Sequence, residues 1–353
     1  MFRRILILAT FLLVVLAISA CGGSSGPTVP GDDEGERVLG VVLPKAGTSL
    51  IAFTRALPDP SNVYSPNREL FLMLPNGSSQ MRLTYNKADD DYAAFSPKGF
   101  ALAFTSNRQS VPWGSHEVYR MNSPWNVIRL TKDAEEWDST AADWAPGMIT
   151  CAQLNTWIMA PFDVVRVQAV EPWGTWEKTI PTEQIASYDP CLSRDGRYLC
   201  FCARPSGPGY FGSMELYLMD LTAGTPPVQL THWGIDPDKP VYTRNPAFDF
   251  TGILVAFDTT FWGEDREIGY INLASAAPVT IPIRVTENKA EDVQPCWDPK
   301  GNWIAFCSNR DGNYEIYKAY VGPSVPPMPV NPVRLTKTPE DESNPDWSPV
   351  YGG

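Results

Sequence analysis

The sequence has little positive charge and very little histidine. It contains 28 lysines and arginines against 40 aspartates and glutamates, which gives a formal net charge of −12. A surface of this sign repels phosphate backbones, so we expect no nucleic-acid partner, and cations or basic proteins fit better. The two histidines, His116 and His232, fall at different positions of the repeat described below, and we expect both to be structural.

Several catalytic signatures are also missing. The chain contains no G-x-S-x-G elbow after a predicted strand, no H-E-x-x-H zinc motif and no phosphate-binding loop. Two carboxylates could in principle support glycoside hydrolysis, but no pair stands out with the required separation. Enzymatic activity therefore stays open, and a protein without catalytic function is the better expectation.

An apolar run at the N terminus has the features of a targeting segment. Arg3 and Arg4 precede an apolar stretch over residues 5–18, which is shorter than the roughly 20 residues that a transmembrane helix needs. The sequence "ISAC" ends this stretch at Cys21, and it resembles a bacterial lipoprotein signal that is cleaved before a lipidated cysteine. An ordinary secretory signal with a chance cysteine is the alternative.

These features predict three parts of the chain. Residues 1–20 form the lipoprotein signal peptide, residues 21–37 form the lipidated cysteine and a flexible linker, and residues 38–353 form the folded part. We expect an exported protein that is anchored by lipid at the outer-membrane or periplasmic face, or at the cell surface, and that does not span the membrane.

What the folded part does contain is a repeat. The segment "PCWDPKGNWIAFCSNR" (295–310) matches "AAFSPKGFALAFTSNR" (93–108) and "DPCLSRDGRYLCFCARP" (189–205), with looser copies at 245–260 and 142–155. A loop, a strand-like run and a closer follow each copy. The closers end near Leu-Thr or Val-Thr, except for the degenerate "EKTIPT" (177–182), and they stand about 50 residues apart. One unit predicts four strands, a to d.

The repeat predicts the architecture. A single four-stranded sheet cannot bury both of its faces, whereas copies stacked around an axis bury them against each other. The 26 glycines, 34 prolines and 12% aromatic residues also favour short strands joined by turns. We therefore expect an all-β fold, a six-bladed β-propeller of four-stranded antiparallel blades.

The two ends of the repeat region predict how the ring closes. The first copy, "SLIAFTR" (49–55), begins at strand b, and the chain ends with "SNPDWSP" (343–349), a strand a without its strand b. The C-terminal strand can thus complete the first blade and remove the exposed sheet edges. A tandem array of separate hairpins would leave these two half-units unexplained.

The pattern P-x-W-S/D-P-x-G-x-x-I-A-F-x-S-N-R-D-G-x-x-E-I-Y, followed by R-L-T, resembles the TolB-type, WD40-like propeller repeat over residues 45–349. This resemblance implies a six-bladed propeller in a bacterial lipoprotein that lacks the N-terminal α/β domain of TolB proteins. The same repeat occurs in propeller domains of peptidases and in oligogalacturonate lyases. The lyase sites are rich in histidine, and two histidines cannot supply such a site.

Acidic residues follow five of the closers, in the loops that lead from strand d to the next strand a. These loops stand at the mouth of a propeller channel. The carboxylates could be solvated, some of them paired with Arg108 and Arg310, or they could form a ring that binds a cation such as Ca²⁺ or a basic partner. The predicted ring consists of Asp90, Asp91, Glu136, Asp138, Asp236, Asp238, Glu291, Asp292, Asp341 and Glu342.

Aromatic residues occupy the loops between strands b and c, which emerge on the same face as the acidic loops. Exposed aromatics beside acids suit a sugar ring or a peptide, while local packing over the blade tops is the alternative. The predicted set is Trp113, Trp157, Tyr210, Phe211 and Trp262.

Two cysteines face each other in the predicted a–b hairpin of the fourth blade. Cys191 lies opposite Cys200, at positions where Ala94 and Ala103 stand in the second blade. Outside the cytoplasm these cysteines could form a disulfide, although cross-strand geometry is often strained. Alternatively, each cysteine replaces alanine as a small buried residue.

Together these observations predict a monomeric scaffold in the cell envelope that binds a protein or a glycan through its acidic, aromatic loop face. The alternative is a hydrolase or lyase that acts on polysaccharide. The sequence predicts no cofactor other than Ca²⁺, as the option at the acidic ring.

Overall fold

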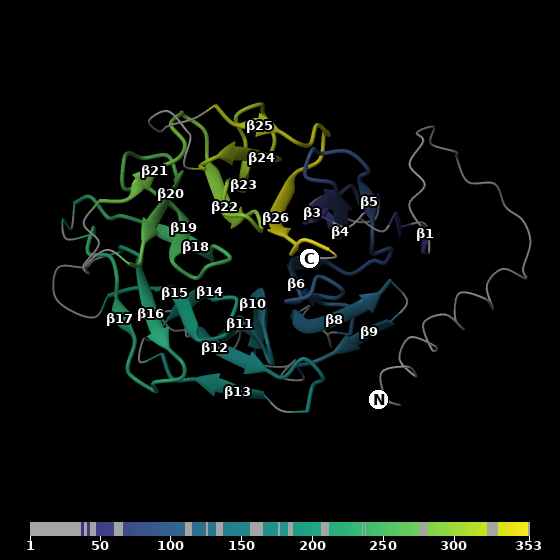
Figure 1. Ribbon diagram of the computed structural model, residues 1–353, viewed down its shortest axis with the longest axis horizontal. Helices are drawn as coiled ribbons and strands as arrows, with labels where there is room; N and C mark the ends of the chain where they lie inside the picture. Colours follow the sequence, from purple (N-terminus) through teal and green to yellow (C-terminus); the bar gives the residue numbers. More distant parts are fainter. Residues whose placement is uncertain are drawn as a thin grey trace, which may run out of the picture.

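Six four-stranded antiparallel sheets surround a central axis in the computed structural model (Figure 1). The predicted signal peptide, Cys21 and most of the linker lie outside the residues that the structure describes. A short pair, β1 (Arg37–Val38) and β2 (Val41–Val42), precedes the first blade. The structure describes residues 37–38, 41–42, 47–59, 66–109, 115–124, 126–131, 137–155, 165–175, 177–182, 186–205, 212–234, 236, 238–274, 281–322 and 331–351.

The first three blades follow the order a to d. The first consists of β26 (Glu342–Trp347), β3 (Ile51–Leu57), β4 (Asn67–Met73) and β5 (Met81–Arg82). The second consists of β6 (Asp90–Phe95), β7 (Leu102–Ser106), β8 (Glu117–Ser123) and β9 (Asn126–Arg129). The third consists of β10 (Trp137–Ala145), β11 (Met148–Asn155), β12 (Val165–Val170) and β13 (Glu177–Ile180).

The last three blades repeat the same order. The fourth consists of β14 (Ser187–Leu192), β15 (Tyr198–Ala203), β16 (Glu215–Asp220) and β17 (Val228–Gln229). The fifth consists of β18 (Thr243–Phe248), β19 (Leu254–Thr259), β20 (Glu267–Asn272) and β21 (Ile283–Arg284). The sixth consists of β22 (Asp292–Trp297), β23 (Trp303–Ser308), β24 (Glu315–Tyr320) and β25 (Val333–Arg334).

The prediction that the C-terminal strand closes the ring is confirmed. Strand β26 pairs with β3, with Trp347 opposite Ile51, and the two strands lie side by side in Figure 1. The Trp347 Nε1 atom donates to the Ser49 Oγ atom at 2.8 Å, so residues nearly three hundred positions apart share a buried hydrogen bond. The first blade therefore exists only when both ends of the chain are in place.

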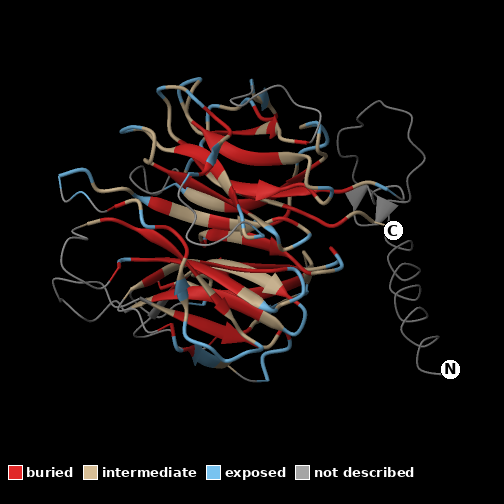
Figure 2. Cartoon of the chain, turned by 60° about the vertical axis from the view of Figure 1, so that its left-hand side comes forward, coloured by how far each residue is buried: buried red, intermediate tan, exposed pale blue. Residues whose placement is uncertain are grey.

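The core lies between the blades. At least four residues of the second strand of each blade are buried, as Ile51–Thr54 of β3 are. Strands are mostly buried and many turn residues are exposed (Figure 2). Phe53 of the first blade packs with Cys307 and Ile316 of the sixth, and Ala256 of the fifth packs with Phe306 of the sixth. Since a buried phenylalanine contributes roughly 1.5–3 kcal/mol, neighbouring blades stabilise each other.

An aromatic pair links strands b and c in four blades, in which a phenylalanine of strand b stacks on the aromatic ring opposite it. The third blade, whose sequence matched the repeat least, has Cys151 opposite Gln168 at these positions. This substitution explains why its repeat is hard to read. The four pairs are Phe53–Phe71, Phe104–Tyr119, Phe201–Tyr217 and Phe306–Tyr317.

Every strand a contains a β-bulge at the same place. The pairing register with strand b shifts there, and one non-glycine residue adopts a left-handed conformation with φ between 49° and 56°. Asparagine and aspartate tolerate this region best, and three of the six residues are of these types. The bulge bends the innermost strand where it lines the axis. The six residues are Tyr92, Ala141, Asp189, Asn245, Gln294 and Asn344.

No helix among the described residues has the length and apolar character needed to cross a membrane.

Candidate functional site

A cavity of about 210 Å³ lies on the propeller axis. Strand a of every blade contributes to its wall, from the bulge residues such as Tyr92 and Asn245 down to the turns between strands a and b. Pro97, Arg194 and Phe250 mark the end at those turns. Because all six blades line it, this cavity is the place where the described residues converge.

One residue from each blade forms a ring in this cavity, directly after the bulge. Each ring residue resumes pairing with strand b, as Ala94 does with Ala103 and Asp143 does with Thr150. Two of the six are alanine, two are cysteine and two are aspartate. The ring consists of Ala94, Asp143, Cys191, Ala247, Cys296 and Asp346.

The two aspartates of the ring bind only backbone N–H groups. Asp143 accepts hydrogen bonds from the backbone nitrogens of Trp144 at 2.7 Å and of Leu192, in the next blade, at 2.5 Å. Asp346 accepts a hydrogen bond from the backbone nitrogen of Phe95, in the next blade, at 2.6 Å. Within the described part of the chain, neither carboxylate has an ion-pair partner.

Burial changes the proton affinity of both carboxyls. It raises the pKa of Asp143, although the N–H groups of Leu192 and Trp144 act in the opposite direction. Burial also raises the pKa of Asp346 to about 7, and the charge of Asp143 adds to this rise. The two groups are therefore close enough to influence each other across the channel.

The bulge residues form a polar network at the opposite end of the cavity. Arg244 donates to Asp189 through Nε at 2.5 Å, and Asn344 donates to Asp91 through Nδ2 at 2.7 Å. Burial and the carboxylates of Asp91 and Asp189 raise the pKa of Tyr92, so its side chain lies within electrostatic reach of the fourth blade. The charges at this end are thus satisfied within the protein.

The mouth at the a–b turns is more apolar. The guanidinium of Arg194 lies 4.2 Å from the ring centroid of Phe250 and donates to the Pro97 carbonyl at 3.3 Å. On the same turn as Pro97, Phe100 is 71% exposed, and its ring contacts Tyr351 edge-on. This mouth thus combines the apolar surface of Pro97 and Phe250 with an acidic interior.

The acidic ring was predicted in the loops between strands d and a, but four of its members do not lie in those loops. Asp90, Asp91, Asp292 and Glu342 are at most 8% exposed and lie inside blades, because they begin strand a instead of standing in loops. Their charges are matched locally. Arg108 pairs with Asp90 at 2.7 Å.

Asp292 shows how these buried acids are held. Arg310 contacts both of its oxygens, at 2.9 and 2.8 Å, and the amide of Asn288 donates to it at 2.6 Å. The guanidinium of Arg310 also lies over the ring of Tyr317. The arginine of the "SNR" loop thus joins strand a to the aromatic pair. The predicted pairing of these acids with Arg108 and Arg310 is therefore present, and the paired acids are buried instead of solvated.

The remaining predicted acids do not converge. Asp236, Asp238 and Asp341 are exposed, and Glu291 pairs with Arg266 at 2.5 Å. Glu136 and the side chain of Asp138 lie outside the described residues. Among the residues that the structure describes, no group of three or more histidines, cysteines, aspartates and glutamates is arranged to hold a metal ion.

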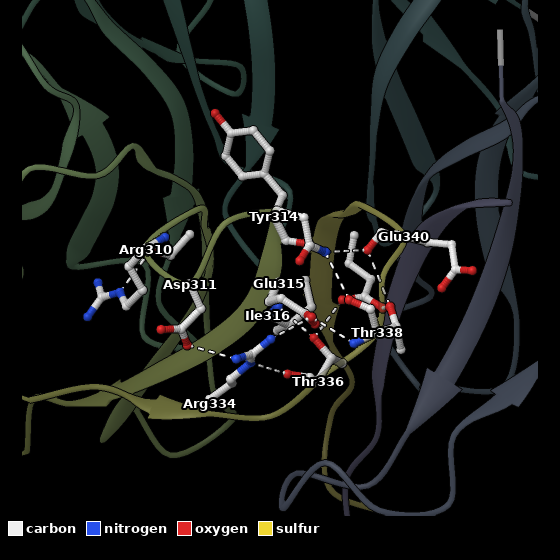
Figure 3. Close-up of polar contacts among 12 residues, drawn as sticks. Arg310, Asp311, Tyr314, Glu315, Ile316, Arg334, Thr336, Thr338 and Glu340 are labelled. Carbon is white, nitrogen blue, oxygen red and sulfur yellow. Dashed lines mark hydrogen bonds and ion pairs between the residues drawn. The ribbon is translucent and has the colours of Figure 1, made fainter. Parts of the chain in front are cut away.

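Glu342 belongs to a polar cluster at the seam where the ring closes. Its Oε1 atom accepts from Arg55 at 2.7 Å and from Thr338 at 2.8 Å, and its Oε2 atom accepts from Thr336 at 2.7 Å. The neighbouring Glu315 accepts from Arg334 and from the Thr338 backbone, both at 2.7 Å (Figure 3). Two glutamates from the sixth and first blades are therefore buried side by side.

The seam leaves one oxygen without a donor. In the second, fourth and fifth blades the closer threonine donates to the glutamate of its own strand c, as Thr286 does to Glu267 at 2.6 Å. Thr336 donates to Glu342 instead, and the buried Oε2 atom of Glu315 accepts no hydrogen bond from the described donors. Glu69 of the first blade also has such an oxygen.

A proton shared between Glu342 and Glu315 would supply the donor that the Glu315 Oε2 atom lacks. Burial and the contact with Glu315 raise the pKa of Glu342 to about 7. Burial alone would raise the pKa of Glu315 as well, but the contact with Glu342 and the hydrogen bond from Arg334 lower it. These directions favour the proton on Glu342, whose O–H group could then donate to the Glu315 oxygen.

Trp262 is the member of the predicted aromatic set that the structure describes, and it packs locally instead of forming an exposed binding face. Its ring packs on Gly269 of β20, where an added Cβ would lie 2.6 Å from the Cη2 atom. It fills the space that an aromatic residue of strand c occupies in other blades, which is the local-packing alternative. Trp113, Trp157, Tyr210 and Phe211 lie outside the described residues.

The predicted register of Cys191 and Cys200 is correct, since the two residues are partners across β14 and β15. Both are free, buried thiols in the structure. Burial raises the pKa of Cys200 to about 12 and that of Cys191 well above its ordinary value.

The two acids that line the cavity, Asp143 and Asp346, were missed by the sequence reasoning. A signal was available in the aligned copies, where "ADW" and "PDW" stand against "PCW", "PCL", "AAF" and "PAF". Only these two blades place a carboxylate at that position.

Comparison with known proteins identifies the fold. No protein-family model matches the chain, and no curated protein matches it. TolB from Acinetobacter baumannii superposes with a TM-score of 0.65 at 13% identity, over 87% of this chain and 68% of that one. A structure assigned to TolB from Agrobacterium tumefaciens gives 0.56 at 14%, over 83% and 90%. Kuenenia stuttgartiensis hydrazine synthase gives 0.65 at 13%, over 86% and 47%.

Proposed function

We propose, from the premise that this chain has the TolB-like six-bladed β-propeller fold, that it is a protein-binding scaffold of the cell envelope. The scaffold binds its partner at the channel mouth formed by the a–b turns. The observation that carries this proposal is the axial cavity, which all six blades line and which contains two carboxylates without an ion-pair partner. A rigid, partly apolar rim around a polar interior is a suitable anchor point for a protein interface.

The side chains at the mouth favour binding of a protein partner, because they are already held in place by contacts within the propeller. Phe100 is exposed, but its ring is held by Tyr351, and the Tyr351 hydroxyl donates to the Gly99 carbonyl at 2.7 Å. Arg194 is held over Phe250 in the same way. Side chains that are ordered before binding lose little entropy on binding, which favours affinity.

Export and anchoring through Cys21 complete this proposal. They rest on the N-terminal sequence, which lies outside the described residues. Metabolic labelling with a lipid analogue tests them directly. We expect label in the wild type and none in C21S, and unlabelled wild type would remove the anchor from the proposal.

Site-specific photocrosslinking in cells tests the binding surface. A photoreactive phenylalanine replaces Phe100 at the mouth in one variant and Val228 in the control. Val228 is 58% exposed on the outer edge strand β17, so the two probes have comparable access to solvent. We expect a discrete protein adduct at position 100 and none at 228. Adducts at 228 alone, or at neither site, would contradict the proposed surface.

A further inference from the structure

We propose that the axial cavity binds a lysine side chain of the partner protein, with its ammonium group held by Asp143 and Asp346. This inference rests on the proposed function and names the chemistry of the group that enters the channel. It is carried by the cavity itself together with a comparison of the six blades.

The blades show that the fold does not require these carboxylates. The same ring position is alanine in the second and fifth blades and cysteine in the fourth and sixth. Burying a carboxylate costs free energy unless it is compensated, and Asp143 and Asp346 receive only backbone hydrogen bonds. The cost at two of six equivalent positions points to a ligand that supplies the missing positive charge.

The other charged groups that line the channel are engaged by side chains of the protein. Asp189 pairs with Arg244 at 2.5 Å. Asp249 serves its own a–b turn, where it accepts from the hydroxyl of Thr251 at 2.6 Å and from the backbone nitrogen of Leu254. Arg194, the cation among the lining residues of the mouth, is engaged with Phe250 and the Pro97 carbonyl. Among the described carboxylates that line the cavity, Asp143 and Asp346 are therefore the two that receive no side-chain donor.

The size and lining of the cavity favour a single side chain. A volume of about 210 Å³ is below the roughly 300 Å³ at which small-molecule pockets begin. The rim residues Pro97 and Phe250, with the wall residue Trp144, offer apolar surface to the methylene stem of a lysine.

Lysine fits the two acceptors better than arginine does. The carboxylates come from the third and first blades, with the second blade between them. An ammonium group is compact and has three donors that point in different directions, so it can serve both carboxylates. The planar fork of arginine matches one carboxylate at a time.

A titration with a lysine mimic tests the inference. The probe is Nα-acetyl-lysine methylamide, and its binding to the purified full-length protein is followed by saturation-transfer NMR. The matched control is Nα-acetyl-norleucine methylamide, which has the same stem without the ammonium group. We expect saturable binding of the lysine probe and at least tenfold weaker binding of the norleucine probe.

Variants place the binding in the channel. In D143A/D346A the ring carries the alanine that two other blades have, and D143N/D346N keeps the side-chain shape, so at least one of the two should fold. We expect either pair to weaken the lysine probe at least tenfold. D220N, which breaks an exposed pair with Arg197, should leave it unchanged. Unchanged binding in a folded double variant would overturn the inference.

Two outcomes separate this inference from the proposed function. If the lysine probe fails to bind while the adduct at position 100 forms, the scaffold proposal stands and the lysine assignment is wrong. If the adduct is also absent, both are wrong. Tighter binding of free cadaverine than of the lysine probe would assign the site to a small amine and overturn the choice of a polypeptide.

Discussion

The proton shared at the ring closure gives a sharp prediction for the substitution Glu342→Gln. A glutamine amide donates permanently to the Glu315 oxygen, whereas the wild-type carboxyl does so only while it is protonated. The Oε1 atom of glutamine can still accept from Arg55 and Thr338. The variant should therefore remain folded and lose the pH sensitivity of the seam.

The magnitude follows from the raised pKa of Glu342. Because the folded pKa lies above the unfolded value of 4.5, the stabilising contribution is complete below pH 4.5 and is lost as the pH rises through about 7. A rise of this size corresponds to about 3 kcal/mol at high pH. Part of this loss is already complete at pH 5, so we expect a net loss of about 2 kcal/mol between pH 5 and pH 9 in the wild type. The lowered pKa of Glu315 affects the free energy of unfolding only below its unfolded value of 4.5.

Denaturant unfolding at pH 5 and pH 9 measures this difference. Relative to wild type, E342Q should gain about 2 kcal/mol in the free energy of unfolding between the two pH values. The matched control is D292N at the equivalent position of the sixth blade, where Arg310 contacts both oxygens. It should lose about 1–3 kcal/mol at both pH values. The shared proton is refuted if E342Q differs from wild type by the same amount at both pH values.

Further predictions concern packing, the channel and the thiols. G269A should displace Trp262 and cost about 1–3 kcal/mol, whereas G263A, whose added Cβ meets nothing within 4 Å, should change the free energy of unfolding by less than about 0.5 kcal/mol in the same assay. Asp346 has a folded pKa of about 7 against 3.8 unfolded, so D346A should gain stability relative to wild type as the pH rises from 5 to 9, and a constant difference would contradict its burial. The six buried cysteines should not react with Ellman's reagent until the protein unfolds, and a yield two thiols short of the reduced, unfolded protein would reveal the Cys191–Cys200 disulfide. Removal of residues 342–353 should abolish cooperative thermal unfolding, because β3 loses its partner β26, and a retained sharp transition would refute the role of ring closure.

The architecture could be predicted from the sequence because each blade repeats the same short sequence pattern. Turn residues and alternating apolar residues define strands a and b. The half-units "SLIAFTR" and "SNPDWSP" define the closure that the pairing of Trp347 with Ile51 confirms. The repeat also predicted the register of Cys191 and Cys200. Such features depend on contacts within one blade or between two strands.

The site was harder to predict because it depends on contacts between blades. Asp90 and Asp292 read as loop acids, but they begin strand a and are held by arginines that arrive from the b–c loop. Trp262 read as an exposed loop residue, and a glycine on the neighbouring strand makes room for it. Asp143 and Asp346 became visible as a pair only when the ring placed the first and third blades around one cavity.

The most direct test of the channel as the binding site is the yield of the photoadduct at position 100 in wild type and in D143A/D346A. The two carboxylates line the cavity, and the crosslinker lies on the a–b turn that carries the rim residue Pro97. Because Asp346 accepts from the backbone of Phe95 before this turn, D143N/D346N, which keeps the side-chain shape, serves as the second variant. We predict that the adduct forms in wild type and falls at least tenfold in the folded double variant. An equal yield in both proteins would contradict a binding site built around Asp143 and Asp346.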